Sequence, residues 1–370
     1  MSIGPYKTNK GRLFYKGNNF FPCIREIRGL KPDCSLVNRH LEIRQNGKKW
    51  GSLVRIWSSV FLATTEFMKL RGALLFDLPI TTRMISSPGA LTGTIPSDVD
   101  PFEINFFNHK TFLTQSSQLY LEFAITNPEI QSVFCWEKSF RREKADFRHL
   151  PEFTHVEFEG NINFKENLII QKEYIQFLVS YIIQNNIGDL GVFLDKKQMS
   201  LLKEFSRLKS FEEISFIDAF KLLKEKTGDP KYNQPTIKKF GAYEEVLITE
   251  AIGQPVFITN FIENEVAFYH AKCEKNKLLA ENADFLFPGY GEVIGSGQRV
   301  RTREETEAKA NRFKLSMRDY KPYIESRDIQ NPKIHSGWGM GIERFVQAVL
   351  QLPFIWEAKV FPRVHNQNHP

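Results

Sequence analysis

A glycine-rich segment near the C-terminus carries the clearest chemical signal in the sequence. Gly337, Gly339 and Gly341 alternate there, and Arg344 follows one helical turn later. Alternating glycines leave the backbone of a strand open to a flat ligand, because any Cβ would hold that ligand off. A planar guanidinium at the next turn can cover the ligand and reach a phosphate. The spacing therefore indicates a nucleotide site, although a GxGxG string alone is more often a tight strand-to-helix junction.

A second group of charged residues lies in a predicted hairpin far earlier in the chain. Arg141 leaves one strand, Arg148 and His149 occupy the turn, and Phe153 opens the returning strand. Two arginines at the ends of a hairpin loop can grip successive phosphates, while a phenylalanine offers a stacking face. Glu143 can hold the arginines or accept a hydrogen bond from an adenine amino group. Taken alone, the segment could equally be a solvated charged hairpin whose phenylalanine belongs to the core.

The elements that must position these groups follow from hydrophobic spacing and from turn residues. The apolar run 73–79 is predicted to be a buried strand that ends on Pro79. Helices are predicted over 48–70, 166–186, 197–208, 215–230 and 301–313, and strands over 102–107, 111–113, 133–141, 154–159, 255–261, 265–271 and 291–294. Helices flanking runs of hairpin strands predict an α+β fold with a mostly antiparallel sheet. We expect residues 1–47 to form a basic arm and residues 48–370 a single domain.

Composition limits the class of protein. The chain has 370 residues, of which 42% are hydrophobic and 25% charged, as in globular proteins. A net charge of +7 suits a polyanionic ligand, either a nucleic acid or a nucleoside triphosphate. No apolar stretch reaches the roughly 20 residues of a membrane span, and no signal peptide is visible, so a cytoplasmic protein is predicted. The four cysteines, Cys23, Cys34, Cys135 and Cys273, form no CxxC or Cys/His cluster, so a zinc site is not predicted.

The two charged groups together resemble a known family. FRxE…RHxxEF followed by GxGxGxER…FPR is similar to motifs 2 and 3 of class II aminoacyl-tRNA synthetases, and Pro79 sits where motif 1 has its proline. The strings FLTQSSQLYLE (112–122), PGYGEVIGSGQR (288–299) and HSGWGMGIER (335–344) most resemble asparaginyl-tRNA synthetases, with aspartyl enzymes of the same subclass IIb next. The resemblance covers residues 48–370. It implies an antiparallel sheet core flanked by helices, ATP and Mg²⁺ as cofactors, and a homodimer built by motif 1.

The resemblance also implies roles in ATP binding. Arg141 would bind the α-phosphate and stabilise charge in the transition state. Phe153 and Arg344 would sandwich the adenine, and Arg148 and His149 would meet the outer phosphates.

Further roles implied by the resemblance concern the metal and the amino acid. Glu292 and Asp284 would hold Mg²⁺ between phosphates, an oxygen-only arrangement suited to that ion. Gln118 would lie in the amino-acid pocket, and Arg299 would face the substrate's side chain. Asp284 could instead be a loop carboxylate, and Gln118 a polar residue at a helix start. The floor of the pocket would be formed by Gly337 and Gly339.

Three departures from the family pattern bear on function. An anticodon-binding OB-fold is not expected, because five strands do not fit before a helix that starts at residue 48. The loop that normally carries clustered glutamates near the amino acid's ammonium offers only Asp98, Asp100 and Glu103. Leu121 stands where aspartyl enzymes have a lysine, which favours an amide side chain but leaves aspartate possible if a second cation assists Arg299.

Every function considered begins with a carboxylate attacking ATP to give an acyl-adenylate and pyrophosphate. We favour an ATP-dependent ligase that passes aspartate, asparagine or a relative to a small nucleophile such as ammonia, independently of tRNA. Short strings around PGYGEV, YKPYIE and FPRV resemble archaeal asparagine synthetase-related proteins.

The alternative is a genuine asparagine or aspartate–tRNA ligase that lacks the usual anticodon domain. Basic residues of the arm could then meet tRNA phosphates, namely Lys7, Lys10, Arg12, Lys16, Arg25 and Arg28. A regulatory module with a dead catalytic core is less favoured, because Arg141 and Arg344 are both present.

Overall fold

An eight-stranded sheet forms the centre of the molecule. The computed structural model describes residues 36, 38–95 and 98–365. The strands lie in the order β1-β5-β6-β11-β10-β9-β8-β7, and they are parallel only between β1 and β5 and between β7 and β8. Their bounds in that order are Leu74–Leu75, Ser132–Phe140, Glu152–Gly160, Ser336–Gly341, Gly291–Gln298, Asn282–Phe287, Val256–Thr259 and Glu212–Ser215. The predicted α+β fold with a mostly antiparallel sheet is therefore confirmed.

Helices and a smaller sheet surround these strands. The smaller sheet has the order β2-β4-β3, with bounds Thr81–Thr82, His109–Leu113 and Glu103–Phe106. The helices of the first half are α2 Arg39–Gln45, α3 Gly47–Leu70, α4 Gly89–Thr92, α5 Gln118–Ala124, α6 Phe164–Asn185 and α7 Ile187–Leu190. Those of the second half are α8 Lys196–Phe205, α9 Phe216–Thr227, α10 Ala242–Ile252, α11 Arg303–Arg312, α12 Met317–Glu325 and α13 Ile342–Val349.

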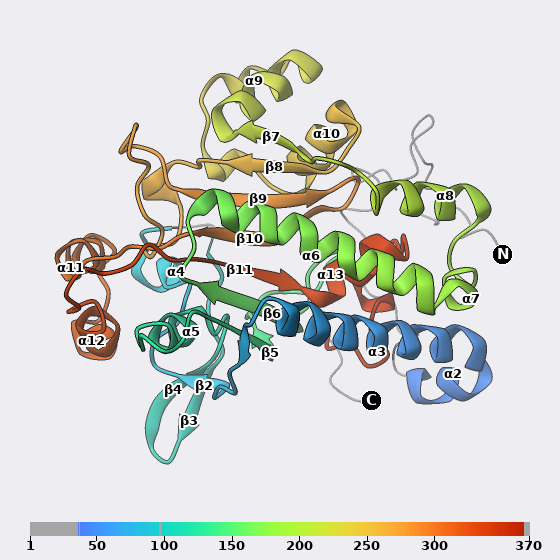
Figure 1. Cartoon of the computed structure of the whole chain (residues 1–370), viewed down its shortest axis with the longest axis horizontal. Helices are drawn as coiled ribbons and strands as arrows, with labels where there is room; N and C mark the ends of the chain where they lie inside the picture. Colours follow the sequence, from blue (N-terminus) through green and yellow to red (C-terminus); the bar gives the residue numbers. More distant parts are fainter. Residues whose placement is uncertain (1–35, 37, 96–97, 366–370) are drawn as a thin grey trace.

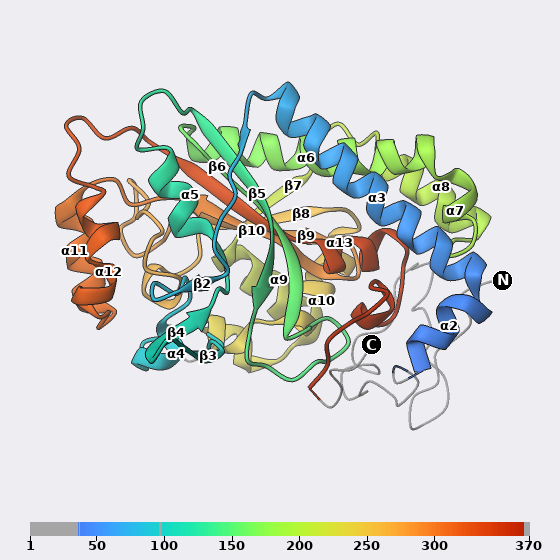
Figure 2. The same ribbon diagram turned by 90° about the horizontal axis from the view of Figure 1, so that it is seen from below.

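Two long helices, α3 and α6, run side by side across one face of the large sheet (Figures 1 and 2). α6 begins at a capping box, in which Asn163 and Glu166 satisfy each other's backbone N–H groups. Beneath it, Trp338 of β11 is 1% exposed and packs on Tyr174 of α6 with ring centroids 4.8 Å apart. Because so large a side chain fills the centre of this layer, its truncation to alanine would cost about 3–5 kcal/mol.

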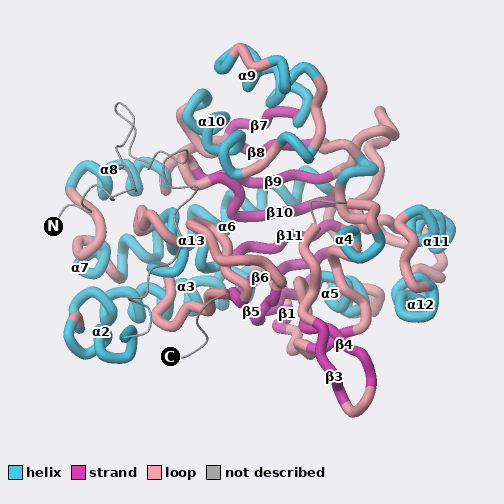
Figure 3. The backbone as a smooth tube through the Cα atoms, turned by 180° about the vertical axis from the view of Figure 1, so that it is seen from behind, coloured by secondary structure: helices cyan, strands magenta, loops and turns pink. Residues whose placement is uncertain are grey.

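Figure 3 views the opposite face of the sheet, where the strands lie in front of the two long helices. Successive side chains of a strand point to opposite faces. On β6, Val156 and Phe158 therefore enter the core under the helices, whereas His155, Glu157 and Glu159 face the other way. The sequence of this strand thus assigns its charged residues to one face.

Two predicted strands differ from the structure. Within the run 73–79 only Ala73 is buried, and β1 comprises only Leu74 and Leu75, which are 54% and 66% exposed. β1 lies at the edge of the sheet beside β5. Its apolar side chains are therefore not covered by other parts of the same chain. Residues 265–271 form a loop with isolated bridges instead of a strand, whereas β9, α10 and α12 were not predicted.

The boundary region between the predicted arm and the domain is partly described. The arm's basic residues up to 35 lie outside the described residues. α2, which falls within the predicted arm, packs on α3, with the Arg39 guanidinium 4.0 Å from the centre of the Trp50 ring. Arg39 also donates to the carbonyl oxygens of Lys359 and Val360. Packing onto the rest of the described chain therefore begins before residue 48.

Within the described part of the chain, none of the helices has both the length and the apolar character needed to cross a bilayer. The cytoplasmic location stays a prediction.

Candidate functional site

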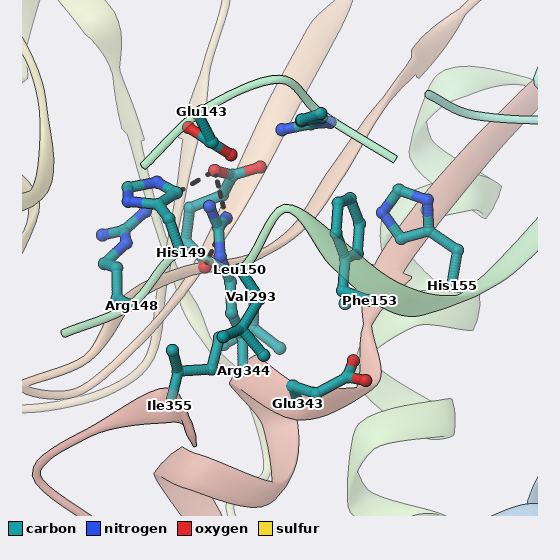
Figure 4. A pocket seen from close by; sticks show the side chains of 14 residues that line it. Glu143, Arg148, His149, Leu150, Phe153, His155, Val293, Glu343, Arg344 and Ile355 are labelled. Carbon is teal, nitrogen blue, oxygen red and sulfur yellow. Dashed lines mark hydrogen bonds and ion pairs between the residues drawn. The ribbon is translucent and has the colours of Figure 1, made fainter. Parts of the chain in front are cut away.

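A cavity of about 450 Å³ lies on the open face of the sheet and unites the two charged groups of the sequence. The hairpin between β5 and β6, strand β10 and the start of α13 build its walls. Figure 4 shows Arg344 rising from α13 into this space, with Phe153 standing on the strand opposite. All seven residues predicted to bind ATP line it: Arg141, Glu143, Arg148, His149, Phe153, Glu292 and Arg344.

Arg344 is held in this nucleotide cavity by Glu292. Its Nη1 donates to the Glu292 carboxylate at 2.8 Å and to the Glu292 carbonyl oxygen at 3.2 Å. Burial would raise the pKa of Glu292, but the charges of Arg344, Arg148 and Arg141 outweigh it and lower the pKa to about 2. The side chain of Glu292 nevertheless remains 31% exposed towards the cavity. The carboxylate is therefore ionised and accessible.

Arg148 is buried and locked by a residue that the sequence did not indicate. Its Nη1 lies 2.5 Å from a carboxylate oxygen of Glu245 on α10, and this carboxylate also accepts from the backbone N–H of Glu292. Gly291 makes the close approach possible, because a Cβ there would lie 2.3 Å from both Arg148 and Glu245, and its φ is +76°. Arg148 therefore contributes a fixed positive charge at the wall.

The hairpin residues form the remaining side of the nucleotide cavity. The Arg141 guanidinium lies 5.3 Å from the centre of the Phe153 ring. His149 is held by Asp146, whose carboxylate oxygens are 2.9 Å from its Nδ1. Figure 4 shows Glu143 above His149 at the rim. A planar ligand entering between Phe153 and Arg344 would meet apolar and cationic faces together.

A second cavity, of about 710 Å³, adjoins the first. Both are lined by Arg141, His155, Glu292 and Gly339, so a ligand in one can touch a ligand in the other. Of the residues predicted to bind the amino acid, Gln118, Arg299 and Gly339 line this amino-acid cavity. Leu121 lines it too.

Gly337 lies outside the linings of both cavities, unlike the prediction. A Cβ there would lie 2.0 Å from the Glu159 carboxylate and 2.3 Å from the Phe158 carbonyl oxygen. The absence of a side chain at Gly337 therefore makes room for the Glu159 carboxylate, and Gly337 does not form the floor of the amino-acid cavity.

Behind the amino-acid cavity lies a closed network of charges. Arg299 donates from Nε and Nη2 to Glu159 at 3.1 Å, and these side chains are 2% and 0% exposed. Gln118 donates to Glu122 at 2.9 Å, and Glu122 also meets Arg327. Burial, opposed by Arg299 and reinforced by Glu122, raises the pKa of Glu159 to about 8. These groups are held by one another before any substrate arrives.

The predicted magnesium ligands lie together at the junction of the cavities. A Cβ on Gly295 would be 3.2 Å from a Glu292 oxygen and 3.7 Å from an Asp284 oxygen. Burial, with the charges of Glu292 and Glu245, raises the pKa of Asp284 well above its usual range. A divalent cation would relieve this crowding of negative charge, so the donor set fits Mg²⁺. No cluster of three or more potential protein ligands occurs among the residues described, so the remaining donors would be phosphate and water oxygens.

The three acidic candidates for the ammonium differ in position. Asp98 lines a third cavity of about 810 Å³, which also includes Arg141, Asp284 and Glu292. Glu103 instead pairs with Lys110 on the exposed β3–β4 hairpin. Asp100 uses its carbonyl oxygen to accept from the backbone of Arg142. Asp98 is thus the candidate closest to the site.

Sequence reasoning missed several residues that line or support the site. His155, Glu157 and Glu159 could have been found, because they alternate on a strand that was predicted. Glu245 and His270 carry no such signal, since Glu245 belongs to α10, which was not predicted, and His270 lies in a loop that was predicted to be a strand.

Comparisons with known proteins agree with this geometry. The family described as tRNA synthetases class II (D, K and N) matches residues 31–365. The asparagine–tRNA ligase of Pelotomaculum thermopropionicum is 34% identical over 334 residues, covering 88% of this chain and 71% of that protein. That of Lactobacillus johnsonii is 32% identical over 357 residues, covering 95% and 77%. The crystal structure of Pyrococcus horikoshii asparaginyl-tRNA synthetase complexed with asparaginyl-adenylate superposes with a TM-score of 0.80 at 28% identity, covering 92% of this chain and 74% of that one.

The comparisons favour a tRNA ligase over the tRNA-independent ligase that we preferred from the sequence. These relatives are named as tRNA ligases or synthetases, and none of them is named as an ammonia-dependent enzyme. The resemblance to asparaginyl and aspartyl enzymes is confirmed at the level of the family. Because the family matches residues 31–365 and all seven predicted ATP-binding residues line one cavity, this chain belongs to the class II tRNA synthetases of the D, K and N group, a family of ATP-dependent ligases.

Proposed function

We propose that this chain is an asparagine–tRNA ligase, which activates asparagine with ATP and transfers the asparaginyl group to tRNA. The observation that carries the proposal is the position of Arg141, which lines both the nucleotide cavity and the amino-acid cavity. The α-phosphate of ATP and the carboxylate of the amino acid would meet beside this guanidinium. Support comes from relatives named asparagine–tRNA ligase and from the likeness to a synthetase solved with asparaginyl-adenylate.

In the first step the asparagine carboxylate oxygen forms a bond to the α-phosphorus, and the bond from that phosphorus to the bridging oxygen of pyrophosphate breaks. Arg141 would stabilise the negative charge that develops on the α-phosphoryl oxygens. Arg148, fixed by Glu245, and His149 would hold the departing pyrophosphate. Phe153 and Arg344 would fix the adenine between them.

Mg²⁺ bound by Asp284 and Glu292 would neutralise charge on the phosphate oxygens. The role of these side chains is to keep two carboxylates directed at the junction of the cavities, where Glu292 is ionised. Glu292 would exchange part of its contact with Arg344 for the cation, which frees that guanidinium for the nucleotide.

The lining of the amino-acid cavity supports an amide substrate. Leu121 faces the cavity, so this position supplies no cation for a substrate carboxylate. Arg299 already donates from two nitrogens to Glu159. A second carboxylate would have to compete with Glu159, whereas an amide can accept one further hydrogen bond from the guanidinium at lower cost.

In the second step a ribose hydroxyl at the tRNA 3′ end would attack the adenylate carbonyl, with AMP as the leaving group. The net charge of +7 is suited to a polyanionic partner.

The decisive experiment measures both half-reactions. ATP–pyrophosphate exchange is followed with a panel of amino acids, and transfer is then followed with total tRNA or with ammonium chloride. We expect exchange that depends on asparagine and the formation of asparaginyl-tRNA that is stable at acid pH. Asparagine-dependent exchange without charging of any tRNA, or release of a free amide product from aspartate and ammonia, would overturn the proposal.

We further propose that the chain forms a homodimer through α3 and β1. Apolar side chains are exposed along this surface, including Leu70 at 73% and Leu75 at 66%. Exposed apolar side chains on a helix and on the sheet edge that follows it are typical of an interface. Leu75→Glu should shift the mass measured by sedimentation at micromolar concentration towards the monomer. Leu278→Glu, at a leucine that is 76% exposed in a loop far along the chain, should leave the mass unchanged. A monomeric wild-type protein would contradict the proposal.

A further inference from the structure

A fourth cavity, of about 640 Å³, lies apart from the three described above. Its walls are the turn that follows α5 and the loop from α12 to β11, at the end of the molecule opposite to α2 (Figures 1 and 2). None of the described residues in its lining also lines the nucleotide cavity, the amino-acid cavity or the third cavity. We call it the basic cavity, because Arg301, Arg327 and Lys333 line it. The binding of ATP and of the amino acid therefore does not explain these side chains.

The most deeply buried charges of the basic cavity neutralise each other. Arg327 is 4% exposed, and its Nη2 donates to the carboxylate of Glu122, which is 0% exposed. The other oxygen of Glu122 accepts from Gln118 of the amino-acid cavity at 2.9 Å. Burial would raise the pKa of Glu122, but Arg327, followed by His335 and Arg299, lowers it to about 2. Glu122 is therefore ionised, and the charge of Arg327 matches it.

The two other cations of the basic cavity carry charge that no carboxylate offsets. Within the part of the chain that the structure describes, Arg301 and Lys333 form no ion pair. Glu122 is the one carboxylate in the described lining. Burial lowers the pKa of His335, which also lines the cavity, so its imidazole is neutral at neutral pH. Three cations and one carboxylate leave the described lining with a net charge of +2.

Apolar side chains form much of the remaining wall, including Ile125, Pro128, Ile329 and Pro332. A concave site with apolar walls and charge of one sign attracts a small ligand of the opposite sign. The Nε of Arg327 is a second indication, because it is buried without a hydrogen-bond partner among the described residues. A buried donor of this kind is costly, and an anion next to the guanidinium would supply an acceptor.

We propose that the basic cavity binds a small organic anion, whose carboxylate or phosphate group meets the uncompensated charge of Arg301 and Lys333. The apolar part of this ligand would pack against the isoleucine and proline side chains of the wall. A metal cation would be repelled by the net positive charge, and a neutral apolar molecule would leave that charge uncompensated. The inference does not depend on the proposed function, because the basic cavity shares no described lining residue with the two substrate cavities.

The test measures the binding of three probes to the full chain by isothermal titration calorimetry. Phenylphosphate and benzoate carry the two candidate anionic groups on the same apolar ring, and benzyl alcohol is the uncharged analogue. We expect both anions to bind at millimolar concentration, more weakly as salt is added, and the alcohol not to bind. The tighter of the two anions identifies phosphate or carboxylate as the preferred group.

Substitutions then place the bound probe. Lys333→Glu reverses one of the uncompensated charges at an exposed position, so the Kd for the tighter anion should rise about 10-fold or more. Lys226→Glu makes the same change at an exposed lysine of α9 and should leave the Kd unchanged. Arg344→Ala removes a cation from the nucleotide cavity, and it should also leave this Kd unchanged.

Four results would overturn the inference: an unchanged Kd in Lys333→Glu, loss of binding in Arg344→Ala, binding of benzyl alcohol as tight as that of the anions, or no binding of either anion. Thermal unfolding shows whether Lys333→Glu is folded. If it is not, Lys333→Gln decides by the same comparison, with a raised Kd supporting the site and an unchanged Kd refuting it. None of these results bears on asparagine-dependent exchange or on tRNA charging, so failure of this inference and failure of the proposed function can be told apart.

Discussion

The nucleotide cavity and the amino-acid cavity use the same kinds of side chain in opposite ways. In the nucleotide cavity the pair Arg344–Glu292 stays 18% and 31% exposed, and both groups can exchange partners with a ligand. In the amino-acid cavity the pair Arg299–Glu159 is 2% and 0% exposed and is closed against solvent. A triphosphate needs cations that it can reach, whereas a small amide needs donors and acceptors that are already fixed. The exposed ion pair can therefore bind a charged ligand, whereas the buried pair holds the shape of the cavity.

The largest effect should come from removing the accessible cation. Arg344→Ala deletes both the guanidinium that faces the nucleotide and the partner of Glu292, so ATP–pyrophosphate exchange should fall about 10³-fold or more. Arg318→Ala, at an exposed arginine of α12, should not change the rate. If exchange survives in Arg344→Ala, the adenine site has been placed wrongly.

A smaller effect, confined to the amino acid, should follow from opening the closed pair. Arg299→Gln removes a donor to the side chain of the substrate, and kcat/KM for asparagine should fall about 10²-fold while the KM for ATP is retained. Because burial already raises the pKa of Glu159 to about 8, that carboxyl can take up a proton and the fold should survive. Arg301→Gln, outside both cavities, serves as the control. A matching rise in the KM for ATP would show that the two cavities are not separable.

Removing the carboxylate that fixes Arg148 should have a moderate effect on ATP binding. Glu245→Gln removes the charge that holds the guanidinium, and the KM for ATP should rise about 10-fold, equivalent to roughly 1.4 kcal/mol. Glu244→Gln also disrupts a buried contact, with the Tyr232 hydroxyl at 2.8 Å, but Glu244 lines neither the nucleotide cavity nor the amino-acid cavity. Steady-state kinetics in ATP should therefore separate the two variants, and equal changes would argue for a general loss of packing.

The smallest effect concerns stability and pH. Burial raises the pKa of Glu137 to about 7. The hydrogen bond from Ser117 lowers this pKa, whereas the negative charges of Glu157 and Asp77 raise it further. The folded state binds this proton more tightly than the unfolded state, so the stabilisation present below about pH 4 is lost as pH rises towards 7. Glu137→Gln should be more stable than wild type at pH 8 by about 1 kcal/mol, after allowance for partial exposure, and equally stable at pH 4.

Urea unfolding at the two pH values checks this, with Glu129→Gln at an exposed loop position as control. The Ser117 hydroxyl donates to Glu137 at 2.8 Å while its backbone N–H donates to Glu157 at 2.7 Å. The expected pH dependence therefore arises at Glu137, which is linked through Ser117 to Glu157 in the lining of the amino-acid cavity. Glu292 of the nucleotide cavity, with a pKa of about 2, should contribute none above pH 5.

The sequence by itself determined the family, the sheet type and the nucleotide cavity. Arg141 to Phe153 belong to one hairpin, and Gly339 to Arg344 belong to one strand-to-helix junction. Within such a unit the spacing along the chain fixes which side chains lie together, because strand alternation and the helical turn are local rules. The neighbouring strands β6 and β11 then bring the two units together.

Only the tertiary structure decided what surrounds Arg299, Arg148 and the short strand β1. Arg299 meets Glu159 across 140 positions of sequence, and Arg148 meets Glu245 across 97. Such partners depend on the register of the whole sheet and on where α10 packs, which no local pattern encodes. For the same reason the apolar run at β1 predicted burial, whereas its place at the edge of the sheet leaves Leu74 and Leu75 exposed.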